Sequence, residues 1–288
     1  FPKGYGGERR SAEEIKRDLD HLELAEKRIR ESRERMSPKE RELSETNEKR
    51  GRAFEVLLVD QIYDGEWLGS NAMSIRTSRF DDVLGGVDMV VEFDRGEGVE
   101  RIALAVDAST TSEIELMRKK MDRNIRRVTE SFWPLEVKYF QSQIAGPDGE
   151  YMKGGLENLI PVVVGADRRN ADRVFDLFSE MITLEKRKDE ESKERRRWLK
   201  EKLSRHPIQG IFFEQVRLQL EMYASIIAEK GGSSGDVDSL LTIIREAEEE
   251  RRDLGFSSSE EVEGDTTLDN IRIISQEYTR QNKGGLNR

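Results

Sequence analysis

Two apolar stretches decide how this chain folds: Gly85-Gly86-Val87-Asp88-Met89-Val90-Val91-Glu92-Phe93 and Leu104-Ala105-Val106-Asp107-Ala108-Ser109. Short apolar runs that are bounded by turn residues are typical of buried strands. The segment Asp94-Arg95-Gly96-Glu97-Gly98 follows the first stretch and is typical of a turn. A hairpin through this turn would bring Asp88 and Asp107 together, so we expect two carboxylates at one end of a sheet.

This pair of carboxylates suggests a cation site. Oxygen ligands suit Mg²⁺ and Mn²⁺, and nucleases use such an ion to activate water and to stabilise a departing phosphate oxygen. A simpler interpretation is also open. Asp88 follows Gly-Gly-Val and Asp107 precedes Ala-Ser-Thr-Thr, and aspartate is common in turns and at helix caps.

The composition excludes several kinds of site. The 288 residues include no cysteine and two histidines, which excludes disulfides, thiolate zinc sites, cysteine nucleophiles and histidine-rich metal sites. Because 35% of the residues are hydrophobic and 38% are charged, we expect a core in part of the chain and solvated helices elsewhere. No apolar run approaches the roughly 18 residues of a membrane span. We therefore expect a cytoplasmic protein without membrane contact.

The distribution of charge bears on nucleic-acid binding. The net charge is −10, whereas duplex-binding proteins usually present a basic face. The best basic tracts are residues 118–127 and 193–205. For the charge-dense helix expected over 185–205, a solvated face is favoured over a nucleic-acid contact, although Trp198 among its arginines could stack on a base. Nucleic acid therefore remains a candidate partner.

The N-terminal region predicts a charged helical arm. Ser11 with Glu14, and Ser37 with Glu40, are capping boxes that predict two helices, the second running to about residue 64. The first helix carries a sparse heptad stripe of apolar residues. The stripe consists of Ile15, Leu19, Leu22, Ile29 and Met36. Such a stripe needs a partner surface, so we expect the arm to pack on the C-terminal helices, with exchange between two copies in a homodimer as the alternative.

The remaining periodicities predict an α/β (α+β) fold. Strands are expected at 71–77, 88–94, 101–107, 136–144 and 158–165, and the amphipathic helix 112–132 follows the third of them. The expected architecture is a central mixed sheet of about five strands with an αβββαβ core, flanked by helical extensions at both ends. We divide the chain into an arm (1–47), an α/β core (48–184) and a helical C-terminal region (185–288).

The order of elements over residues 48–165 resembles the PD-(D/E)XK nuclease-like superfamily. By this resemblance, Glu55, Asp88 and Asp107 would be metal ligands, and the carbonyl of Ala108 would be a further one. Asp88 and Asp107 would then be catalytic, with Mg²⁺ or Mn²⁺ as the cofactor. Ser109 stands where the family carries a lysine. A lysine ammonium beside the metal holds the attacking water and offsets charge on the phosphate, and a serine brings no charge.

Other lysines are candidates for that role. Lys120 flanks the sheet-facing stripe of helix 112–132, although it lies about two turns, roughly 12 Å, from the helix start. Lys119 faces water. Glu136-Val137-Lys138 is a literal Glu-x-Lys on a strand, but a whole helix separates it from Asp107, so we favour Lys120 as the third catalytic residue.

Three functions follow from these patterns. We favour a nuclease-like protein with a degenerate site, associated with nucleic acid and with weak or no cleavage. One alternative is an active Mg²⁺-dependent nuclease. The other is a helical assembly protein, built on a catalytically inert nuclease fold, that binds a protein partner through its arms. Fold resemblance alone does not establish which of these is correct.

Overall fold

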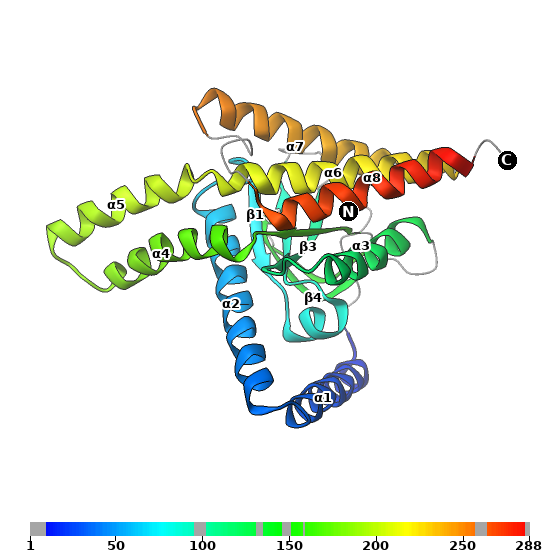
Figure 1. Cartoon of the computed structure of the whole chain (residues 1–288), viewed down its shortest axis with the longest axis horizontal. Coiled ribbons are helices and arrows are strands. Elements are labelled where there is room, and N and C mark those ends of the chain that lie inside the picture. The colour runs from blue at the N-terminus through cyan, green and yellow to red at the C-terminus, as the bar shows by residue number, and fades with distance from the viewer. Residues whose placement is uncertain are drawn as a thin grey trace.

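The computed structural model describes residues 10–94, 102–130, 135–145, 151–157, 159–256 and 264–285. Within these ranges the protein is a mixed α/β structure. A four-stranded sheet lies at the centre, a two-stranded sheet lies beside it, and helices surround both (Figure 1).

The central sheet consists of β1 (Ala72–Arg76), β2 (Met89–Phe93), β3 (Ile102–Ser109) and β6 (Ile160–Gly165), in that order. The first three strands are antiparallel neighbours, and β6 runs parallel to β3. The predicted pairing of the stretches around Asp88 and Asp107 is therefore confirmed. The turn expected at 94–98 lies outside the described residues from position 95 onward.

The strand expected at 136–144 is present as β4 (Val137–Ala145), but it does not join the central sheet. It pairs with β5 (Tyr151–Leu156) in a separate antiparallel sheet. The central sheet of the described chain thus has four strands instead of the expected five or so. Sequence patterns missed β5 because Gly154 and Gly155 interrupt it, and glycine weakens a strand signal.

Two long helices begin the chain, α1 (Ala12–Glu34) and α2 (Pro38–Tyr63), and both have the predicted capping boxes. Only the second half of α2 is buried, through Phe54, Leu57, Leu58 and Ile62. That half packs on the sheet and places Glu55 near the end of β1.

The expected packing of α1 on the C-terminal helices is wrong. The arm instead lies against the π-helical turn η1 (Asp81–Gly85), at the opposite end of the molecule from α6, α7 and α8 (Figure 1). Asp18 fixes it there, because this buried carboxylate accepts hydrogen bonds from Lys138 Nζ at 3.0 Å and from the Tyr139 hydroxyl at 3.0 Å, both on β4. These polar contacts could not be read from an apolar stripe.

Six helices follow β3 in the described part of the chain, and those expected over 112–132 and 185–205 are the first and third of them. The six are α3 (Ile114–Thr129), α4 (Arg168–Glu185), α5 (Glu190–Ser204), α6 (Ile208–Glu229), α7 (Gly235–Asp253) and α8 (Thr266–Gly285). One hydrophobic cluster runs from α2 and the sheet through α6, α7 and α8. The C-terminal helices therefore complete the core of the sheet, and the division expected at residue 184 remains a prediction.

Helix α6 closes the open edge of β6 with polar side chains. Gln219 accepts the N–H of Val163 at 2.9 Å and donates to its carbonyl at 2.8 Å, and Gln215 makes the same two bonds with Gly165, both at 2.8 Å. Both glutamine side chains are buried. Their amides occupy the positions that the backbone of a further strand would take.

Candidate functional site

The fold brings Asp88 and Asp107 to the same end of the sheet. Asp88 immediately precedes β2, where its N–H donates to the carbonyl of Val106 on β3 at 2.9 Å. Its Oδ2 atom accepts the N–H of Ala108 at 2.7 Å. The Asp88 carboxylate therefore lies against the residue that follows Asp107, as the hairpin prediction requires.

Asp107 is buried and both of its oxygens have cationic partners. Lys120 Nζ lies 2.6 Å from Oδ1, and Arg123 Nη2 lies 2.6 Å from Oδ2. Both cations come from α3, which packs against β6, the neighbour of β3. The second turn of the helix therefore lies beside Asp107, and the distance from the helix start does not keep Lys120 away.

Burial and the neighbouring acids raise the pKa of Asp88. Burial raises the pKa of Asp88 to about 8, the charges of Asp107 and Glu55 add to the rise, and the hydrogen bond from Ala108 opposes it. Burial also raises the pKa of Glu55, with a contribution from the charge of Asp82. Asp88 and Glu55 are thus both harder to ionise than ordinary carboxyls, and neighbouring acids contribute to both pKa shifts.

The carboxylates do not fit a divalent cation as they are arranged. Across the part of the chain that the structure describes, no three Asp, Glu, His or Cys side chains are grouped so that they could hold a metal ion. Asp107 is paired with two cations, Glu55 Oε2 accepts from Arg76 at 3.0 Å, and Asp88 accepts from Ala108. The Mg²⁺ or Mn²⁺ cofactor stays a prediction of the sequence.

Ser109 is buried, and its side chain carries no ammonium group that could act beside Asp107. Its hydroxyl accepts the N–H of Thr111 at 3.5 Å, a contact within the loop that leads to α3. Lys120 is the lysine that reaches Asp107, and Lys119 is exposed, as the helical spacing predicts.

Sequence reasoning missed Arg123 and Arg127 as members of the site. Arg127 Nη2 donates to the carbonyl of Gly85 at 2.8 Å, and Arg123 Nη2 lies 3.5 Å from that of Gly86. The signal was present, because the two arginines follow Lys120 at helical spacings of three and seven residues. The sequence shows that this tract is basic, but it does not show which face of α3 turns toward Asp107.

The Glu-x-Lys sequence at Glu136 and Lys138 forms ion pairs with residues outside the Asp107 cluster. Glu136 is paired with Arg10, and Lys138 with Asp18 of α1. Both partners lie near the N-terminus, so this pair anchors the arm and is no part of the Asp107 cluster.

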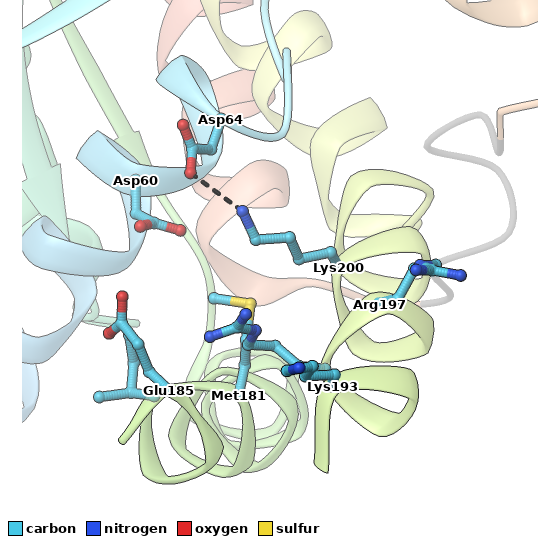
Figure 2. Close-up of a pocket in the computed structure, with 9 residues that line it drawn as sticks. Asp60, Asp64, Met181, Glu185, Lys193, Arg197 and Lys200 are labelled. Atoms are coloured by element: carbon cyan, nitrogen blue, oxygen red, sulfur yellow. Dashed lines mark hydrogen bonds and ion pairs between the residues drawn. The ribbon is translucent and has the colours of Figure 1, made fainter. Parts of the chain in front are cut away.

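A cleft of about 500 Å³ lies between the end of α2, α4 and α5. Its cations come from the second basic tract, and acids from α2 and α4 face them (Figure 2). Lys200 reaches across to Asp64 at 3.3 Å. At the neighbouring face of α5, the Arg195 guanidinium lies 4.1 Å from the centre of the Trp198 ring. This tract is thus partly neutralised, and one face of Trp198 is already covered.

A second cleft, of about 620 Å³, lies beside Glu55. Charges of both signs line it. Its lining residues are Glu26, Glu48, Gly51, Arg52, Glu55, Arg76, Thr77, Arg79 and Asp82. Because Arg76 pairs with Glu55 and Arg79 with Asp82, most of this charge is balanced within the cleft.

Comparisons with family models, with curated proteins and with solved structures found no match to this chain. In the described ranges, no helix is both long and apolar enough to cross a membrane.

Proposed function

We propose that this protein is nuclease-like with a degenerate site, and that it associates with nucleic acid while cleaving it weakly or not at all. The order α2–β1–β2–β3–α3–β6, with β6 parallel to β3, supports the resemblance to the PD-(D/E)XK nuclease-like core. The convergence of Asp88, Asp107 and Lys120 at one end of the sheet supports it further.

One observation carries the proposed loss of activity. Both oxygens of Asp107 are held by Lys120 and Arg123, each at 2.6 Å, so the carboxylate is neutralised by side chains instead of a metal ion. Ser109 supplies no charge to replace the missing ammonium. Loss of one positioned electrostatic group costs about 10²–10³ in rate.

The test is a cleavage assay on labelled single- and double-stranded DNA and RNA with Mg²⁺ or Mn²⁺. We expect no cleavage, or slow cleavage, by the unchanged chain. Creation of cleavage by Ser109→Lys, and its loss on adding Asp107→Ala, would support an eroded site. Rapid metal-dependent cleavage by the unchanged chain would contradict the proposal.

An active Mg²⁺-dependent nuclease is the alternative, and the contact between Lys120 and Asp107 favours it. If Lys120 performs the family lysine's role, Lys120→Met should abolish any cleavage that the chain shows. Lys119→Met is the matched control, since Lys119 is the adjacent exposed lysine on the same helix. Equal effects of the two substitutions would exclude a specific role for Lys120.

A helical assembly protein is the second alternative. Ile15, Leu19 and Ile29 on α1 remain 38%, 59% and 40% exposed, so three of the five residues of the heptad stripe are exposed within one chain. A partner or a second copy could cover it. Deletion of residues 1–36 followed by measurement of the mass in solution tests this, and an unchanged mass would exclude dimerisation through the arm.

A further inference from the structure

Three cationic side chains lie in one row along α3. Lys120 and Arg123 bond the two oxygens of Asp107, and Arg127 bonds the carbonyl of Gly85. Among these bonding partners, only the carboxylate of Asp107 is negatively charged. The three side chains therefore carry more positive charge than their partners neutralise. Burial and the charge of Arg123 lower the pKa of Arg127 to about 10, as expected for a cation crowded by another cation.

Two guanidinium nitrogens in this row are buried without a partner among the described residues. They are Nε of Arg123 and Nη1 of Arg127. A buried donor without an acceptor costs about 1–3 kcal/mol, and buried polar groups in native proteins are normally satisfied by protein, water or an ion. The described residues provide no acceptor for either nitrogen, so an anion bound beside α3 would supply one.

The backbone at Gly86 is shaped to admit Arg123. Gly86 has a backbone φ angle of +61°, which residues other than glycine rarely adopt. A Cβ atom at this position would lie 2.5 Å from Nη1 of Arg123. Only glycine lets the guanidinium approach this closely, so the end of η1 and α3 are matched to each other.

We propose that Lys120, Arg123 and Arg127 form a phosphate-binding row that works without a metal ion and holds the sugar–phosphate backbone of a nucleic acid. Arginine forks bind phosphate through paired hydrogen bonds. The ammonium and guanidinium groups take the place beside Asp107 that a divalent cation would occupy. This inference rests on the proposed association with nucleic acid and names the surface that makes the contact.

The extent of the row favours a polymer over a small anion. Residues 120 to 127 span about 10 Å along the helix at 1.5 Å per residue, which exceeds a single phosphate group. The side chains of Lys120 and Arg123 are 28% and 38% exposed and Arg127 is partly exposed, so each member of the row reaches the surface in part. Lys119 and Arg126, both exposed, extend the positive surface beyond it.

The rest of α3 strengthens this surface. The helix has six basic and two acidic residues, in a chain whose net charge is −10. One of the acids, Asp122, accepts a hydrogen bond from the Tyr278 hydroxyl of α8 at 2.5 Å. Within α3, Arg118 is paired with Glu277, and Lys120 and Arg123 share the single carboxylate of Asp107. In α5, Lys193, Arg195 and Lys200 each have a separate acidic partner.

The test measures nucleic-acid binding by fluorescence anisotropy. The probes are fluorescein-labelled single-stranded DNA, single-stranded RNA and duplex DNA of about 20 nucleotides. Binding is measured in EDTA, which removes free metal ions, at a series of salt concentrations. We expect the unchanged chain to bind without a metal ion. Arg123→Gln with Arg127→Gln should weaken binding at least about tenfold and reduce the slope of log Kd against log salt by about 2, one for each lost phosphate contact.

Three further variants sharpen the result. Arg196→Gln with Arg197→Gln removes the same two charges from α5 and should leave affinity nearly unchanged. Arg123→Lys with Arg127→Lys keeps the charge and should retain the salt slope while losing affinity. Gly86→Ala keeps every charge but displaces Arg123, and should weaken binding with a smaller loss of slope.

The outcomes separate two failures. If no labelled nucleic acid binds to the unchanged chain, the proposed association with nucleic acid is itself wrong. If nucleic acid binds but only with Mg²⁺, or if the α5 pair weakens it as much as the α3 pair, the phosphate-binding row is wrong and the association stands.

Discussion

The carboxylate of Asp88 accepts the N–H of Ala108 at 2.7 Å and is thereby held next to Asp107. This position is unfavourable for an ionised Asp88, because burial and the nearby charge of Asp107 both raise the pKa of its carboxyl. Strongly perturbed pKa values cluster at functional sites. The energetics of this pair can be measured.

Asp88→Asn should stabilise the protein at alkaline pH. The pKa of Asp88 is about 8 in the folded chain, above its ordinary 3.8, so between these values the folded state holds a proton that the unfolded state has lost. Stability therefore falls as pH rises through this window. We expect Asn to raise the free energy of unfolding at pH 8 by up to about 5 kcal/mol, at about 1.4 kcal/mol per unit of pKa, and to change it little at pH 4.

Urea unfolding at the two pH values measures this effect. Asp20→Asn, at an exposed acid of α1, is the control and should show no such difference. A loss of stability at pH 8 in Asp88→Asn would mean that the Asp88 carboxylate is ionised and well paired.

His206 should make the protein sensitive to acid. Its Nδ1 atom accepts the N–H of Ile208 at the start of α6, at 3.2 Å, and burial together with the charge of Arg173 lowers its pKa from 6.5 to about 4. The unfolded chain takes up a proton below pH 6.5 while the folded chain does not, so stability is lost as pH falls from about 6.5 to about 4.

His206→Asn keeps an acceptor at this position and should flatten the dependence of the melting temperature on pH between 6.5 and 4. His21, the other histidine of the chain, is exposed on α1. His21→Asn should leave the pH dependence as it is. If the melting temperature depends on pH in the same way for both variants and for the unchanged chain, His206 is not the source of the acid sensitivity.

Asp18→Ala should release α1. The carboxylate bonds Lys138 and Tyr139 of β4, and these contacts hold an arm whose own apolar stripe is largely exposed. We expect faster hydrogen exchange in α1 and no change in α6–α8, measured by mass spectrometry. Asp20→Ala on the exposed side of the same helix is the control, and equal exchange in the two variants would show that other contacts hold the arm.

Gln219→Met should destabilise the whole protein. Methionine matches glutamine in shape but leaves the N–H and carbonyl of Val163 without the partners seen at 2.9 and 2.8 Å. We expect a loss of about 3 kcal/mol in the free energy of unfolding, measured by urea denaturation. Gln276→Met, at an exposed position on α8, should cost little. Similar losses for both variants would show that the pairing with β6 contributes nothing specific.

Strand ends and helix starts could be predicted because local residues determine them. The apolar stretches around Asp88 and Asp107 pair as expected, and the two serine caps begin α1 and α2 as expected. Both features depend on residues that are close together in the chain, so their pattern is visible in one dimension.

Contacts between distant segments could not be predicted in the same way. The position of α1 depends on Asp18 meeting β4, some 120 residues away. Arg123 belongs to the site because Gly86 leaves room for it, and a glycine in sequence does not indicate which side chain will approach it. Gln215 and Gln219 read as polar interruptions of an apolar helix until β6 is placed beside them.

The solubility of the central sheet depends on α6, because this helix covers the free edge of β6 although it lies far from it in the sequence. Residues 160–165 are almost entirely apolar, and an uncovered strand edge of that kind recruits other chains. A fragment that ends at residue 184, where the sequence suggests a domain boundary, would expose this edge. Such a fragment should aggregate, even though every strand of the central sheet is present in it.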